Sequence, residues 1–237
     1  MVKRYWIIII LYIAAQLFPA IGAGLAISML GVSEGDAFVY SYIFGMTIAS
    51  IITIALLSPD MEQSQMRNRP GIPYIIKWAV IGFFLAFLAQ YVANIINITI
   101  LDLDQSSENT KLIMDIIDEN VYFILLPILF APLLEEIIFR KIIFGQLYKK
   151  MNFFFSAVIS ALIFSLLHFD FTFVLTYLAM GLVFAYLYVK TQRIIVPILV
   201  HMAMNTTVVL IQMNVDIDEL ERKLEEIENS AMILIGG

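Results

Sequence analysis

The sequence contains no cysteine, only two histidines and few charged residues, although it is 237 residues long. Without cysteine, the chain has no disulfide, no thiolate nucleophile and no cysteine-bound metal. Charged residues make up 14% of the sequence and hydrophobic residues 61%. In soluble domains, charged residues make up about 25% and apolar residues about 45–50%. This composition excludes an ordinary soluble protein and indicates an integral membrane protein.

Long apolar runs recur along the chain, and a helix needs about 20 apolar residues to cross a bilayer. They predict an all-α, polytopic membrane helix bundle of about seven (six to eight) transmembrane helices. The runs are residues 6–30, 37–58, 74–101, 121–134, 153–168, 171–189 and 194–213. Nearly every residue lies in a run or a short connector, so residues 1–237 are expected to form a single membrane domain.

Basic residues occur in alternate connectors, and acidic residues dominate the other connectors. The basic ones are Lys3, Arg4, Arg67, Arg69, Lys77, Lys149, Lys150, Lys190 and Arg193. Basic residues in short loops favour the cytoplasmic side. The N-terminus is therefore predicted to be cytoplasmic and the C-terminus to lie outside.

Two segments outside the runs have helical apolar spacing. Between residues 102 and 120, apolar residues recur among acidic ones, which predicts a helix lying at the membrane interface. Residues 214–230 predict an acidic, amphipathic C-terminal helix. Such a tail either folds onto the protein surface or contacts a partner, including a second copy of the chain in a homo-oligomer.

Two adjacent glutamates, Glu135 and Glu136, follow the fourth apolar run. A carboxylate at the bilayer centre costs about 2.5–3.5 kcal/mol, so the pair either marks a helix end or has a function. Arg140 follows Glu136 by four residues, a spacing that favours an ion pair, whereas Glu135 points about 100° away. Pro127 and Pro132 remove helix hydrogen bonds just upstream, which predicts a kinked, water-accessible position beside Glu135.

The two histidines lie in later runs, and each has a partner four residues away. In "FSLLH", Phe164 and His168 share a helix face, so the phenyl ring is expected to pack beneath the imidazole. In "HMAMN", His201 and Asn205 are expected to project into one cavity. A single histidine in an apolar helix is more often a packing residue, but the glutamate pair favours a functional role.

These side chains suit the activation of water. Glu135 can take a proton from water, one histidine can orient or share that proton, and the other can join Asn205 in donating hydrogen bonds to an oxyanion. Alternatively, Glu135, His168 and His201 could hold a zinc ion with an open position for water. Both mechanisms lead to hydrolysis.

The three motifs together resemble those of the CAAX protease and bacteriocin-processing (CPBP, or Abi) family of intramembrane proteases. The matching stretches are "EEIIFR" at 135–140, "FSLLH" at 164–168 and "HMAMN" at 201–205, in the family's order. Residues 120–212 carry the resemblance and are predicted to be the catalytic core helices.

The resemblance implies an intramembrane endopeptidase in which Glu135 and His168 activate water, and His201 and Asn205 stabilise the oxyanion. The implied supporting residues are Glu136, Arg140 and Phe164. It favours an enzyme without a tightly bound metal or other cofactor, with zinc as the alternative. The implied partners are the lipid bilayer of a bacterial plasma membrane and a hydrophobic peptide or membrane-anchored protein substrate, and no nucleic acid.

Two other functions are compatible with such a membrane protein. A non-catalytic protein of the same fold could bind a peptide or partner, for example in bacteriocin self-immunity, but the complete set of polar motif residues argues against it. A transporter or proton relay also places Glu and His within the membrane. Transporters typically show internal repeats, and the sequence shows none.

Overall fold

The computed structural model describes residues 2–65, 71–103, 107–215 and 222–223. Within these ranges every regular element is helical. The elements before the glutamate pair are α1 (Lys3–Leu17), α2 (Pro19–Leu30), α3 (Glu34–Gln65), α4 (Ile72–Thr99), α5 (Glu108–Glu119), η1 (Val121–Ile124) and η2 (Leu126–Phe130). The remaining elements are α6 (Ala131–Glu136), η3 (Ile137–Phe144), α7 (Gly145–Leu147), α8 (Phe153–Leu166), η4 (Phe171–Phe173), α9 (Val174–Thr191) and α10 (Ile195–Asn214).

Five helices in the described part of the chain are long and apolar enough to cross a membrane. They are Glu34–Asp60, Ile72–Thr99, Val121–Leu147, Phe171–Thr191 and Ile195–Asn214. Helices α1 and α2 form a sixth candidate span if they are counted together, although they meet at an angle of 53°. The chain is therefore an all-α, multi-pass membrane protein, as predicted.

The seven predicted runs are all helical, but three differ from the prediction in length or shape. The first bends where α2 begins, because Pro19 has no N–H to continue the hydrogen bonds of α1. The fifth, α8, has only 14 residues. The fourth continues to Leu147, so the alternative that Glu135 and Glu136 mark a helix end is wrong.

This long helix, which we call the central helix (Val121–Leu147), is wound unevenly. Two stretches of it, η2 and η3, have the wider turns of a π-helix. Pro127 and Pro132 cannot donate backbone hydrogen bonds, and at η2 the helix adjusts by widening its turns instead of breaking. Wide turns of this kind occur frequently at functional sites.

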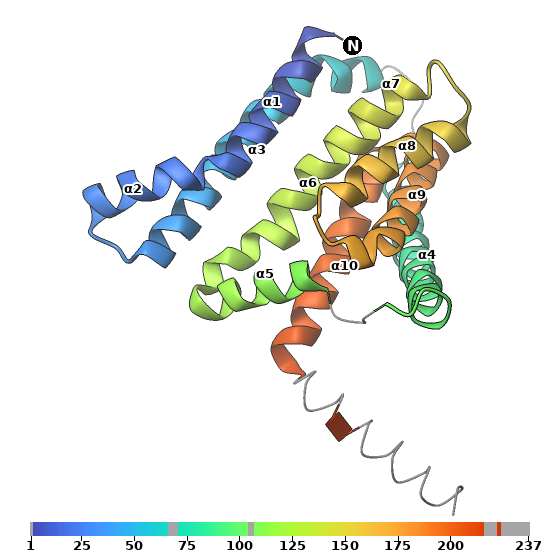
Figure 1. The fold of residues 1–237 in the computed structure, drawn as a ribbon. Coiled ribbons are helices and arrows are strands. Elements are labelled where there is room, and N and C mark those ends of the chain that lie inside the picture. Colours follow the sequence, from blue (N-terminus) through green and yellow to red (C-terminus); the bar gives the residue numbers. More distant parts are fainter. Residues whose placement is uncertain (1, 66–70, 104–106, 216–221, 224–237) are drawn as a thin grey trace, which may run out of the picture.

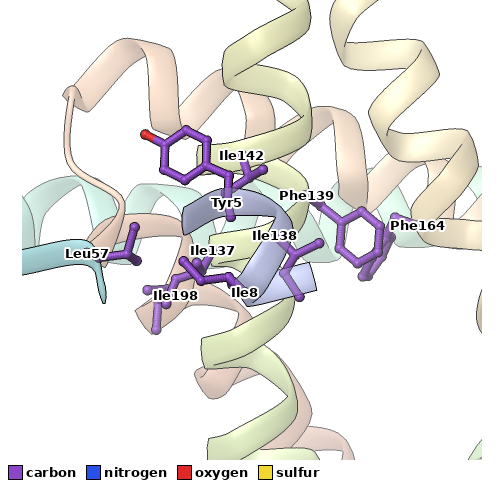
Figure 2. Packing of buried hydrophobic residues seen from close by; sticks show 9 residues of the cluster. All are labelled: Tyr5, Ile8, Leu57, Ile137, Ile138, Phe139, Ile142, Phe164 and Ile198. Atoms are coloured by element: carbon purple, nitrogen blue, oxygen red, sulfur yellow. The ribbon is translucent and has the colours of Figure 1, made fainter. Parts of the chain in front are cut away.

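The central helix lies between two groups of helices (Figure 1). On one side are α1, α2 and α3, and on the other are α4, α8, α9 and α10. Side chains from both groups meet on the central helix in one buried cluster (Figure 2). Its members are Tyr5, Ile8, Leu57, Ile137, Ile138, Phe139, Ile142, Phe164 and Ile198.

The helix expected at the interface is α5, which lies at one end of the bundle (Figure 1). Ser107 caps it by accepting a hydrogen bond from the backbone N–H of Thr110 at 3.1 Å. Ile117 is buried against the bundle, whereas Leu112 is exposed. The predicted tail helix of residues 214–230 lies almost entirely outside the described residues.

Candidate active site

The first glutamate-histidine contact joins the central helix to α10. Oε1 of Glu136 lies 3.0 Å from Nδ1 of His201 and 3.0 Å from Nη1 of Arg140. All three side chains are buried, and Glu136 is fully so. The predicted pairing of Glu136 with Arg140 is confirmed, and His201 joins it as a third member.

Aromatic rings pack closely against the guanidinium of Arg140. Its guanidinium carbon is 4.3 Å from the ring centre of Phe164 and 5.0 Å from that of Phe184, distances at which a cation is attracted to the ring face. A Cβ atom on Gly181 would lie 2.6 Å from Cβ of Ala161 and 3.4 Å from Nη2 of Arg140. Glycine at this position therefore lets α8 and α9 pass close together beside the buried guanidinium.

Glu135 has different neighbours, although it is also largely buried. Its Oε2 lies 3.9 Å from Nε2 of His201, and its Oε1 accepts a hydrogen bond from the Tyr12 hydroxyl at 3.4 Å. Arg140 is paired with Glu136 at 3.0 Å and Tyr12 with Glu135, whereas His201 contacts both carboxylates. The sequence predicted the pairing of Glu136 with Arg140, but it left Glu135 without a partner and did not indicate that Tyr12 would contact it.

His201 faces both carboxylates through its two ring nitrogens. Nδ1 is directed at Glu136 and Nε2 at Glu135. Phe184 stacks on the imidazole at 5.0 Å with an interplanar angle of 24°, which fixes the plane of the ring. The ring therefore stays bound to Glu136 while its Nε2 faces Glu135 across 3.9 Å, a separation that one bridging water could span.

His168 follows the end of α8, and its Nδ1 lies 2.9 Å from the carbonyl oxygen of Phe164. Because a carbonyl only accepts, Nδ1 carries the hydrogen and a neutral ring presents Nε2 as an acceptor. Phe164 packs edge-on against the imidazole at 4.6 Å, as its spacing predicted. Tyr177 stacks on the imidazole at 4.2 Å.

Hydrogen bonds join the turn that carries His168 to the start of α5. Asp170 is buried and accepts hydrogen bonds from Ser107 at 2.6 Å and from Thr172 at 3.0 Å. Asn109 donates to the Tyr177 hydroxyl at 3.4 Å. The interfacial helix therefore helps to hold both the turn and the ring that stacks on His168.

Asn205 makes its hydrogen bond to the central helix backbone. Its Nδ2 donates to the carbonyl oxygen of Pro127 at 2.8 Å. In the wide turn, the Ala131 N–H donates to the carbonyl oxygen of Leu126. The next carbonyl, that of Pro127, would need an N–H from residue 132, which is proline and has none. Asn205 supplies that missing donor and keeps one amide hydrogen for another partner.

The structure brings His201 against both Glu135 and Glu136, pairs Glu136 with Arg140, and places Phe164 against Arg140. His168 does not hydrogen-bond to Glu135 or His201 within the described residues. The ring of Phe164 lies between the two histidines, with its centre 4.6 Å from that of His168 and 6.1 Å from that of His201.

Sequence reasoning missed three side chains of the site: Tyr12, Tyr177 and Phe184. One signal for Tyr12 was available, because Gln16 follows it by four residues within an apolar run, and two polar groups on one face of a membrane helix indicate a polar contact. Tyr177 and Phe184 had no such signal. Aromatic residues in a membrane helix are ordinarily packing residues.

The zinc alternative requires Glu135, His168 and His201 to converge on one point. In the part of the chain that the structure describes, no three His, Asp or Glu side chains are close enough to hold one metal ion. The arrangement of Glu135, His168 and His201 in the structure therefore does not fit a zinc ion.

Comparisons with known proteins agree with the motif pattern. Residues 117–207 match the family described as "Type II CAAX prenyl endopeptidase Rce1-like". The chain is 37% identical to the putative membrane peptidase YdiL of Bacillus subtilis (strain 168), over 99% of this chain and 98% of the relative. It is 32% identical to the membrane-embedded CAAX protease MroQ of Staphylococcus aureus (strain USA300), over 89% and 90%. No solved structure matches the chain. Full-length similarity to these relatives, together with the family match over the central helix and α8–α10, shows that the chain is a membrane peptidase that belongs to the Rce1-like family of type II CAAX prenyl endopeptidases.

Proposed function

We propose that the chain hydrolyses a peptide bond of a hydrophobic or membrane-associated peptide or protein, with Glu135 as the base that activates water. One observation carries the proposal: Arg140 pairs with Glu136, while Oε2 of Glu135 faces Nε2 of His201 at 3.9 Å. A water molecule that bridges these two atoms would lie about 2.8 Å from each of them. Glu135 is therefore placed to take a proton from this water, on the side of the carboxylate that faces His201.

The reaction consumes one water molecule. Glu135 takes a proton as the water oxygen bonds to the substrate carbonyl carbon, and the former carbonyl oxygen becomes the oxyanion. When the oxyanion collapses, the C–N bond breaks and the leaving nitrogen receives the proton from Glu135. The products are a carboxylic acid and an amine, so all atoms are accounted for.

Three side chains assist these steps in the proposal. When both ring nitrogens carry hydrogen, His201 donates from Nδ1 to Glu136 and from Nε2 toward the oxyanion. Asn205 offers its second amide hydrogen to the same oxyanion, and its first is held by Pro127. His168 presents Nε2 as an acceptor to the attacking water, because its Nδ1 is bound to Phe164. No metal takes part.

Cleavage by purified protein tests this proposal. We expect the wild type in detergent to cut at least one member of a panel of apolar and C-terminally prenylated peptides, with fragments that together exceed the substrate by one water in mass. His168→Ala should lose most of this activity, and a metal chelator should leave the wild type unchanged. Binding without cleavage would favour the non-catalytic self-immunity function. Loss on chelation and recovery with zinc would contradict the metal-free mechanism.

We also propose a bacterial plasma-membrane location with the N-terminus in the cytoplasm. Arg4 and Lys141 both pair with Asp60, so the beginning of α1, the end of α3 and the end of the central helix lie at one basic end of the bundle. Basic ends favour the cytoplasm. A reporter that is active only outside the cytoplasm should respond when it is fused after residue 215 and stay silent when it is fused before residue 3. The reverse pattern would contradict this orientation.

A further inference from the structure

A chain of hydrogen bonds runs from α3 through α1 to Glu135. The Tyr42 hydroxyl donates to Oε1 of Gln16 in a short contact. Nε2 of Gln16 donates to the Tyr12 hydroxyl at 2.9 Å, and Tyr12 donates to Oε1 of Glu135 at 3.4 Å. The three residues before Glu135 all lie outside residues 117–207, the segment that matches the family.

The direction of this chain follows from the atoms that take part. An ionised carboxylate only accepts hydrogen bonds, and an amide nitrogen only donates. Tyr12 therefore accepts from Gln16, and its own hydrogen is directed to Glu135. Tyr42 completes the pattern by donating to the amide oxygen of Gln16, so every hydrogen in the chain is directed toward Glu135.

Packing of α1 against the central helix places Tyr12 at this position. Tyr5 and Ile8 lie beside Ile137 and Ile138 in the buried cluster (Figure 2). Tyr12 follows Ile8 by four residues, so it lies on the same face of α1, one turn further along. The packing of α1 against the central helix therefore brings Tyr12 into contact with Glu135.

The two carboxylates receive donors of different kinds. Glu136 faces the guanidinium of Arg140, a permanent positive charge. Glu135 faces a neutral phenol, which orients one carboxylate oxygen without neutralising the group. With Oε1 held by Tyr12, Oε2 is left facing His201. The hydrogen bond from Tyr12 is long at 3.4 Å, and catalytic hydrogen bonds are often long before substrate binds and shorten in its presence.

We infer that Tyr12 is a positioning residue for Glu135, held in place by Gln16 and Tyr42, so that the N-terminal helices complete the active site. The inference rests on the proposed role of Glu135 as the base. It assigns a function to a part of the chain that none of the three sequence motifs includes.

Steady-state cleavage of an internally quenched apolar peptide that the wild type cuts tests the inference. Tyr12→Phe should lower kcat about tenfold, as expected for losing one hydrogen bond to a charged group, with little change in KM or thermal unfolding in detergent. Tyr42→Phe, two bonds further from Glu135, should have a smaller effect in the same direction. Tyr91→Phe, which removes an exposed hydroxyl from α4, serves as the matched control and should behave as the wild type.

A second comparison separates positioning from general support of the fold. In the Glu135→Gln background, Tyr12→Phe should not lower the residual activity further, because there is no carboxylate left to orient. An equal tenfold loss in both backgrounds would overturn the inference. So would wild-type kcat in Tyr12→Phe while Glu135→Gln is inactive. If Glu135→Gln kept full activity, the proposed function itself would fail.

Discussion

Glu135→Gln is expected to lower kcat/KM by about a hundredfold to ten-thousandfold, the range in which general bases contribute to enzymatic reactions. Glutamine keeps the size of the side chain and can still accept from Tyr12, but it cannot take a proton from water. Stability should change little, because Arg140 and its partner Glu136 are untouched. The loss should therefore be in kcat, while KM and the unfolding temperature stay near the wild-type values.

The measurement is cleavage of the same quenched peptide by purified variants in one detergent. Glu34→Gln provides a control, because it removes an equal charge from an exposed site in the first turn of α3. It should retain full activity. A Glu135→Gln variant that cleaves as fast as the wild type would remove Glu135 from the chemistry. An equal loss in Glu34→Gln would trace the effect to overall charge.

The contacts that were predictable from the sequence join residues four positions apart, in a helix or in the turn that directly follows one. Helical geometry brings Glu136 and Arg140 together, and the turn that follows α8 keeps His168 against Phe164. The contact of His201 with Glu136 joins residues 65 positions apart in sequence. It depends on how α10 packs against the central helix, which residue spacing does not encode.

The fold shows a similar division. Apolar runs predicted every membrane helix, because length and composition decide whether a segment can lie in lipid. They did not predict where α8 ends, because backbone and side-chain contacts stop the helix at the turn that carries His168. Phe169 in this turn adopts a positive φ of 54°, and Asp170 accepts a hydrogen bond from Ser107, the cap of α5. Nor did the prolines break the central helix, because wide turns and the Asn205 hydrogen bond accommodate them.

Glu136→Gln is expected to destabilise the protein by about 3–5 kcal/mol, the usual result of removing one partner from a buried ion pair. Arg140 would keep its charge, with only 1% of its surface exposed and no carboxylate at 3.0 Å. Activity should fall partially, because His201 would lose the acceptor that orients Nδ1. Unfolding in mixed detergent micelles and peptide cleavage measure the two effects, with Glu34→Gln again as the exposed control.

The double variant Glu136→Gln/Arg140→Met identifies the cause of this destabilisation. If an uncompensated guanidinium is responsible, replacing it with an apolar side chain among Phe164 and Phe184 should restore much of the stability lost in Glu136→Gln. Activity should stay low, because His201 still lacks its carboxylate partner. Additive losses in the double variant would contradict the ion-pair explanation. A Glu136→Gln variant that is fully stable yet wholly inactive would instead make Glu136 a direct participant in the chemistry, because an interaction that leaves folding unchanged but abolishes turnover acts in the transition state.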